Sequence, residues 1–247
     1  MKKTKKDLHI LYIQIRPDEE TRKEEFDEFI RFSGLEKDQF TYHNVFDTPE
    51  FDETIIEGHD AIFVGGSSDA TVLEPEKYPF IVGIKTVFKY ALEQNIPVFA
   101  SCFGFEVAVE TFGGKVIMDR ENMEMGMYPI QLTDAAKTDR LFHDMTKGCY
   151  VVSGHQERAH QLPDEAILLA SSKLCPFHAF RMKNTNFYAF QFHPEIDMDD
   201  LIARLRRYKN KSYFDDHDHV ERLIEDCKPV PESNGLLGKF VDRVLLT

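Results

Sequence analysis

Cys102 is the residue whose type and position most favour nucleophilic chemistry. It follows a short apolar run at 98–101 and precedes an expected helix at 103–112. The amino end of a helix carries partial positive charge and free N–H groups, and both favour a thiolate. Gly104 lets the chain pack closely in such a turn, as in the nucleophile elbow of hydrolases. Because an isolated cysteine is more often a buried structural residue, position alone does not assign a reaction to Cys102.

His193 and Glu195 have the side chains that a thiol nucleophile needs for proton transfer. They end an expected strand in the sequence QFHPE, where Pro194 biases His193 toward an extended backbone. Residues two apart in an extended chain project to the same side. An imidazole can then take and return a proton while the carboxylate fixes its tautomer. A surface pair or two metal ligands are the alternatives for this pattern alone, but together with Cys102 it indicates a cysteine-dependent enzyme.

These two segments resemble the signatures of class I glutamine amidotransferases. SCFGFEVAVETFGGKV at 101–116 is similar to the family's Cys-x-Gly-x-Gln and Glu-x-x-Gly-Gly pattern, and FQFHPE at 190–195 to its second signature. Three weaker segments agree with the resemblance: FVGGSSDAT, EMGMYPIQLT and GHQERAHQLPDEAILLASS. The resemblance covers about residues 8–208 and is nearest to stand-alone proteins similar to the amidotransferase domain of GMP synthase, which include γ-glutamyl peptidases.

The resemblance implies a role for each residue of the site. Cys102 becomes the nucleophile, His193 the general acid and base, and Glu195 the residue that orients the imidazole. The backbone N–H groups of Gly66 and Phe103 would form the oxyanion hole. The implied reaction is hydrolysis of the amide bond of a small γ-glutamyl compound through a glutamyl thioester.

Substrate contacts are implied for Glu106, His155 and Gln156. The chain departs from the family at Glu106, where Gln is usual, and at Ala100, where Gly is usual. An anionic Glu106 would raise the pKa of the Cys102 thiol unless a cation offsets it. We therefore hypothesise that Glu106 contacts the α-ammonium, or another cationic group, of a γ-glutamyl ligand.

The order of elements predicts an α/β protein that positions these residues at the ends of parallel strands. Strands are expected at 8–15, 39–46, 60–64 and 98–101, and helices at 18–32, 80–92 and 103–112. Shorter strands follow at 115–118, 127–133, 148–153, 166–172, 176–182 and 187–192. The family resemblance implies a flavodoxin-like three-layer α/β/α fold with a mainly parallel central sheet. We expect one domain over 1–247, with 212–247 as a helical C-terminal extension packed on it.

The composition limits the classes of partner and the cellular compartment that we expect. A net charge of −13 argues against nucleic acid, and we expect no membrane association because no apolar stretch reaches spanning length. The four cysteines form no C-x-x-C pair, which favours reduced thiols in the cytoplasm. Neither a cofactor nor a metal is expected. The cluster at 215–219 (DDHDH) is interpreted as an acidic helix start, and the turn at 65–68 lacks the lysine of a phosphate-binding loop.

Three functions remain open at this level. The first is a stand-alone γ-glutamyl amide hydrolase, since nothing in the sequence resembles an ATP-binding loop. The second is a glutaminase subunit that supplies ammonia to a separate synthetase. The third, of another class, is a catalytically silent member that binds a ligand or regulates a partner. The oligomeric state is left open.

Overall fold

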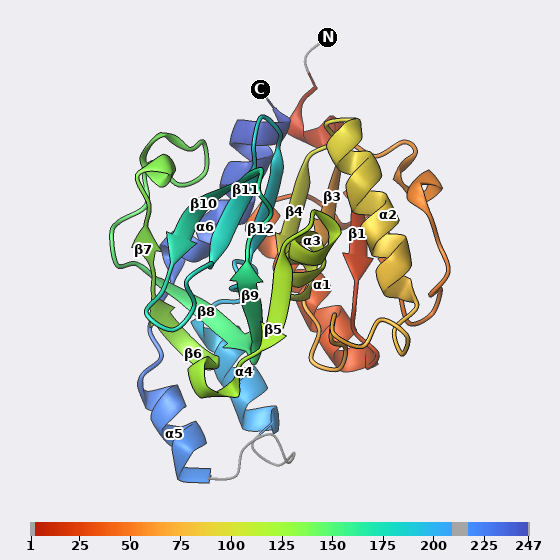
Figure 1. The fold of residues 1–247 in the computed structure, drawn as a ribbon. Coiled ribbons are helices and arrows are strands. Elements are labelled where there is room, and N and C mark those ends of the chain that lie inside the picture. Colours follow the sequence, from red (N-terminus) through yellow and green to blue (C-terminus); the bar gives the residue numbers. More distant parts are fainter. Residues whose placement is uncertain (1–2, 209–216, 247) are drawn as a thin grey trace.

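An eight-stranded sheet organises the chain, in the order β2-β1-β3-β4-β12-β11-β10-β7. It is seen in a computed structural model that describes residues 3–208 and 217–246 (Figure 1). Five neighbouring strands are parallel: β2 (Phe40–Asn44), β1 (Ile10–Gln14), β3 (Ala61–Val64), β4 (Val98–Ser101) and β12 (Phe187–Phe190). Every residue of the last four is buried, as expected of a parallel sheet covered on both faces. This strand order is that of a flavodoxin-like doubly wound sheet.

The second half of the sheet is antiparallel. It contains β11 (Ala179–Met182), β10 (Ala166–Ser171) and the short β7 (Gln131–Leu132). Two separate two-stranded sheets accompany it: β5 (Lys115–Met118) pairs with β9 (Glu157–Gln161), and β6 (Glu124–Pro129) with β8 (Tyr150–His155). The strand expected at 127–133 is therefore two strands, and β9 was not expected at all.

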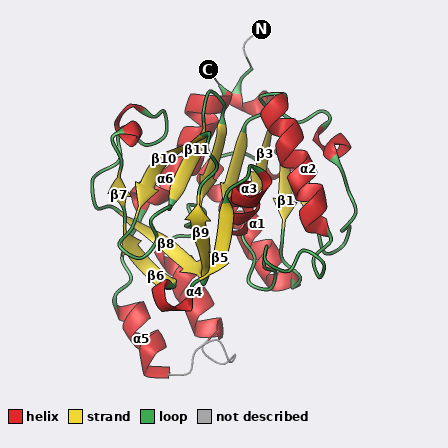
Figure 2. Cartoon of the chain, in the orientation of Figure 1, coloured by secondary structure: helices red, strands yellow, loops and turns green. Residues whose placement is uncertain are grey.

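Helices cover both faces of the sheet (Figures 1 and 2). α2 (Phe80–Glu93) and α3 (Phe103–Thr111) contribute to one apolar core, while α1 (Glu19–Ser33) and α6 (Pro231–Phe240) contribute to the other. α1 begins where the Asp18 side chain accepts from Thr21 N at 2.9 Å and ends at Gly34, whose φ is 65°. These two caps set the ends of α1, the helix whose charged side chains lie beside the site.

The C-terminal helices add to this framework. α4 (Met198–Tyr208) and α5 (His217–Glu225) contact each other and share a small apolar cluster with Val152 and Ile196. α6 is continued by a π-helical turn at Val241–Leu245. The side chains of the 215–219 cluster lie outside the described residues.

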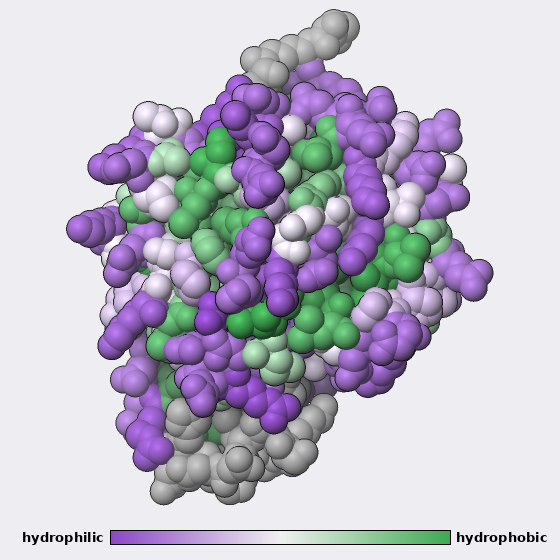
Figure 3. Space-filling model, viewed as in Figure 1, coloured by the Kyte–Doolittle hydropathy of each residue, from purple (hydrophilic) through white to green (hydrophobic). Residues whose placement is uncertain are grey.

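The visible surface is mainly hydrophilic. Hydrophilic residues cover most of the face in Figure 3, and the apolar residues gather in separate areas between them. In the described part of the chain, no helix combines the length and apolar character needed to cross a membrane.

We predict that a variant with Phe240 truncated to alanine unfolds at a lower denaturant concentration than wild type. Its buried ring lies 5.8 Å from that of Phe63 and 5.4 Å from that of Phe99, so α6 is part of the core. Phe240→Ala should lower the free energy of unfolding by about 3–5 kcal/mol in urea titration. Val82→Ala, at a position 64% exposed, is the control and should change it by less than about 0.5 kcal/mol. Equal effects would show that α6 contributes little to the fold.

Candidate active site

Cys102 occupies the sharp turn between β4 and α3. Its backbone has φ 49° and ψ −102°, a conformation that residues with a side chain rarely adopt. Cys102 N donates to Phe190 O at 2.7 Å, and Glu106 N donates to Cys102 O at 3.1 Å. The chain packs closely at Gly104, where an added Cβ would lie 3.1 Å from the Ala100 Cβ and would press on it. The predicted close packing of the turn at Gly104 is confirmed.

His193 and Glu195 form a buried pair just after β12. His193 Nδ1 lies 2.6 Å from Glu195 Oε1, and His193 N donates to Val152 O at 2.8 Å. Burial opposes ionisation of Glu195, but the nearby imidazole and its hydrogen bond hold the pKa of this carboxyl below its usual value. The carboxylate can therefore fix the ring with Nδ1 protonated, which leaves Nε2 to exchange a proton with a reacting group.

Cys102 and His193 meet beside Gly66, in the loop after β3. An ideal Cβ on Gly66 would lie 2.8 Å from His193 Cε1 and 3.3 Å from Cys102 Cβ. Both side chains therefore border the same point, although they come from distant parts of the sequence. Glu195 contacts the ring at Nδ1, so the three predicted residues form one cluster.

Asn234 of α6 fixes the turn that carries Glu195. Its buried side-chain amide donates to Pro194 O and Ile196 O, at 2.9 Å each. The C-terminal extension thus holds the histidine and carboxylate in place as well as covering the sheet. No sequence pattern predicted this contact, because asparagine is a residue type that is mostly exposed.

Charged groups act on the Cys102 thiol in both directions. Burial and the Glu106 carboxyl raise its pKa well above the ordinary value, while the Arg16 guanidinium lowers it. Glu195 also raises the pKa, and the Phe103 N–H lowers it. Because the raising effects prevail, Cys102 rests as a neutral thiol and needs a base to become a nucleophile.

Glu106 lies in the first turn of α3 and is 5% exposed. Gln191 Nε2 donates to its Oε1 at 3.1 Å. Burial, together with the carboxyl of Glu157, raises the pKa of Glu106 well above its ordinary value. The side chain is thus favoured in its neutral form, in which it resembles the glutamine usual in the family.

The two expected oxyanion donors differ in their surroundings. Phe103 N–H is directed toward the Cys102 sulfur, where an oxyanion donor is needed. Gly66 N instead donates to Glu25 Oε1 of α1 at 3.3 Å. For Gly66 to bind an oxyanion, its amide would have to leave this long hydrogen bond.

His155 and Gln156 are not among the residues that line the cavity at His193, although Ser153 and Gly154, directly before them, are. His155 Nδ1 is 2.9 Å from Glu157 O, and its Nε2 is 3.3 Å from Glu124 Oε2. Gln156 is half-buried, and its carbonyl accepts from Asp119 N.

One group among the described residues has the donors and proximity to hold a metal. Donor atoms of His155, Cys175 and His178 lie within 4.8 Å of one another. Glu124 already joins the two imidazoles, since its Oε2 also lies 2.6 Å from His178 Nε2. Ser172 donates to the other oxygen of Glu124. As it stands, the group is a hydrogen-bonded link between segments of the antiparallel half.

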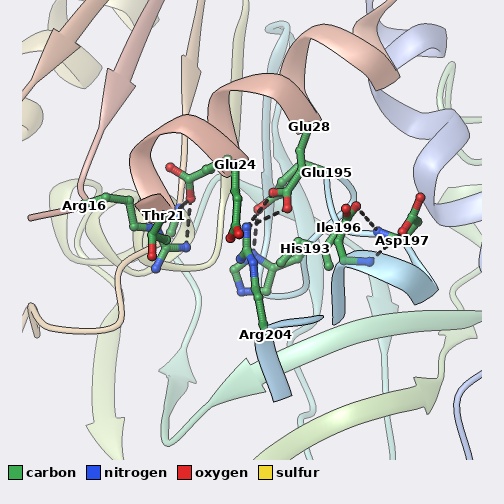
Figure 4. Close-up of polar contacts among 12 residues, drawn as sticks. Arg16, Thr21, Glu24, Glu28, His193, Glu195, Ile196, Asp197 and Arg204 are labelled. Atoms are coloured by element: carbon green, nitrogen blue, oxygen red, sulfur yellow. Dashed lines mark hydrogen bonds and ion pairs between the residues drawn. The ribbon is translucent and has the colours of Figure 1, made fainter. Parts of the chain in front are cut away.

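A cavity of about 90 Å³ adjoins His193. Its polar lining includes Arg16, Ser67, Ser68 and Arg204, and its apolar lining includes Met125, Val152, Ile196, Leu201 and Leu205. Figure 4 shows α4 contributing Arg204 beside His193 and Glu195, where it meets Glu28 of α1. Both Glu28 oxygens accept from Arg204, at 2.7 and 2.6 Å.

Fold and site together define an α/β protein with a cysteine, histidine and glutamate at the carboxyl ends of adjacent parallel strands. Residues 38–205 match the family Glutamine amidotransferase class-I. The chain belongs to this family.

Individual relatives fall into two groups. GMP synthase of Thermosipho melanesiensis is 27% identical over 64% of this chain and 29% of its own length. Gamma-glutamyl peptidase 3 of Arabidopsis thaliana is 25% identical over 83% and 82%. The chain thus spans less than a third of that GMP synthase but most of the peptidase. A glutamine amidotransferase structure from Thermotoga maritima superimposes with a TM-score of 0.73, at 20% identity, over 98% of this chain and 99% of that one.

We predict that Gly66→Ala disables the site without unfolding the chain. The new Cβ would lie 2.8 Å from His193 Cε1, so the ring or the loop must shift and the geometry between His193 and Cys102 changes. Glutamate release from γ-glutamyl substrates should fall at least about 100-fold. Gly235→Ala, whose Cβ would meet nothing closer than 3.9 Å, is the control. Equal activity of both variants would contradict the placement of His193.

We also predict that Glu106→Gln makes Cys102 more reactive as pH rises. Protonated Glu106 has no charge, so variant and wild type should agree at low pH. Above the raised pKa of Glu106 its negative charge opposes thiolate formation, and the variant lacks that charge. The rate of alkylation by iodoacetamide, measured against pH, should therefore diverge in favour of the variant. Superimposable profiles would show that Cys102 does not sense this carboxyl.

Proposed function

We propose that this chain hydrolyses a γ-glutamyl amide bond through a glutamyl thioester on Cys102. The observation that carries the proposal is the meeting of Cys102 and His193 at Gly66, with Glu195 2.6 Å from the ring. The names of the relatives support the substrate class, since one is a glutamine-hydrolysing synthase and another a γ-glutamyl peptidase.

The proposed reaction starts from Cys102 as a neutral thiol, which needs a base to lose its proton. His193 Nε2 takes the proton of the Cys102 thiol as the sulfur bonds to the γ-carbonyl carbon. Phe103 N–H, and Gly66 N–H once released from Glu25, stabilise the resulting oxyanion. As the intermediate collapses, the C–N bond breaks and His193 gives its proton to the departing amine or ammonia. Water then attacks the thioester, His193 transfers a proton from water to sulfur, and glutamate leaves.

Glu195 supports both steps by stabilising the imidazolium. Its pKa lies below the ordinary value, so it is present as a carboxylate beside the ring that carries the proton. The account uses no cofactor. All four cysteines are free, in keeping with a reducing compartment, and we propose the cytoplasm.

A stand-alone hydrolase is favoured over a glutaminase subunit. The peptidase relative matches over 83% of this chain and 82% of its own length, so the two are similar in extent. The similarity to GMP synthase supports the second candidate, in which ammonia passes to a separate synthetase. Glutamate release that begins only when a synthetase is added would favour that candidate.

We predict that Cys102→Ala abolishes glutamate release from every γ-glutamyl compound that wild type cleaves. A panel of glutamine, γ-glutamyl peptides and γ-glutamyl amines should show at least about a 10³-fold loss, because no other group can form the thioester. Cys149→Ala, which removes a half-buried cysteine away from the site, should keep the wild-type rate.

The same panel tests the remaining alternatives. If Glu106 contacts a cationic group of the ligand, Glu106→Gln should change the ranking of substrates, and an unchanged ranking would remove that hypothesis. A folded wild type that releases no glutamate, and whose Cys102 is not modified by a glutamine-analogue chloroketone, would instead indicate the catalytically silent function.

A further inference from the structure

Arg16 is a buried cation that no sequence motif singled out. It follows β1 and is 3% exposed. Its Nε and a terminal nitrogen contact Glu25 Oε1 at 2.9 and 2.8 Å, and its other terminal nitrogen donates to Ser68 Oγ at 2.8 Å. Tyr12 donates to the second Glu25 oxygen at 2.6 Å. The guanidinium is thus fixed on several sides.

The fixed guanidinium reaches the meeting point of the site. The Cβ position on Gly66 that lies 3.3 Å from Cys102 Cβ and 2.8 Å from His193 Cε1 is also 3.1 Å from an Arg16 terminal nitrogen. Arg16 also lines the cavity beside His193. Figure 4 shows it extending from the sheet toward α1 on the same side as His193.

The charges around Cys102 require such a cation. Glu195 after β12 opposes a thiolate, and so does Glu106 of α3 whenever it is ionised. Among the groups that act on Cys102, Arg16 is the permanent positive charge, because a guanidinium does not titrate in the working range of proteins. It therefore offsets the negative charge that Glu106, in place of the family's usual glutamine, has when it is ionised.

Arg16 also restrains the loop after β3. It holds Ser68 directly, and it shares Glu25 Oε1 with the amide of Gly66. We propose that Arg16 is a positioning residue that presents a fixed positive charge to the Cys102 thiolate and anchors the Gly66 to Ser68 loop against α1. This role for Arg16 in catalysis rests on the proposed function.

The test is the pH dependence of Cys102 alkylation by iodoacetamide, which needs no γ-glutamyl substrate. In Arg16→Met the apparent pKa of the thiol should rise, and alkylation at pH 7 should slow by about tenfold or more, since one pKa unit is a factor of ten in thiolate. Arg16→Lys keeps the charge but loses the two-pronged contact with Glu25, so it should fall between Met and wild type. Arg181→Met, which removes an arginine paired with Asp139 at 3.1 Å, is the control and should leave the profile unchanged.

A second variant separates an effect of charge on Cys102 from an effect of unfolding. Arg16→Met leaves Glu25 buried without its cation, which is strongly destabilising. The double variant Arg16→Met with Glu25→Gln removes both charges and should still raise the apparent pKa of the thiol. Urea unfolding of each variant shows whether the comparison is made on folded protein.

The outcomes separate this inference from the proposed function. An unchanged alkylation profile in folded Arg16→Met or in the double variant would overturn the role of Arg16, even if wild type releases glutamate. A shifted profile in a protein that cleaves no γ-glutamyl compound would support the charge on Cys102 and overturn the proposed function instead.

Discussion

The backbone of Cys102, held at φ 49° and ψ −102°, determines where every other part of the site must lie. A non-glycine residue in a sparsely populated conformation costs about 1–3 kcal/mol and persists only where its surroundings enforce it. Here β4 is fixed between β3 and β12, Phe190 O accepts the Cys102 amide, and Gly104 allows α3 to start against Ala100. The strain directs the sulfur out of the sheet toward the loop at Gly66. If the turn relaxed, neither the imidazole nor the helix amides would face the sulfur.

The parallel sheet explains how residues far apart in sequence come together. β4 and β12 are neighbours and run in the same direction, so Cys102 and His193 follow strand ends at one edge of the sheet. α1 faces the same region with two buried carboxylates three residues apart: Glu25 holds Arg16, and Glu28 holds Arg204. α6 fixes the turn at Glu195 from the other end of the chain. The fold thus supplies a fixed electrostatic frame as well as a position for each reacting group.

Much of this arrangement could be predicted from local signals. The apolar run before Cys102 defines β4 at 98–101, and the QFHPE sequence follows an apolar strand, so both segments had recognisable ends. β9 escaped prediction because its sequence, ERAHQ, is polar and lacks a clear alternation. The contacts of Arg16 and Asn234 could not be predicted either. They depend on how α1 and α6 dock on the sheet, and their own sequence neighbourhoods carry no catalytic pattern. The engagement of Gly66 N with Glu25 has the same origin.

In the proposed reaction the Cys102 sulfur, deprotonated by His193, becomes covalently bonded to the glutamyl group. Mass spectrometry of protein quenched in acid during turnover of a γ-glutamyl substrate tests it most directly. The account predicts a glutamyl group on the peptide that contains Cys102, and on no peptide containing Cys149, Cys175 or Cys227. Glutamate formed at a measurable rate, with every cysteine peptide unmodified even when the thioester is trapped by hydroxylamine, would contradict it.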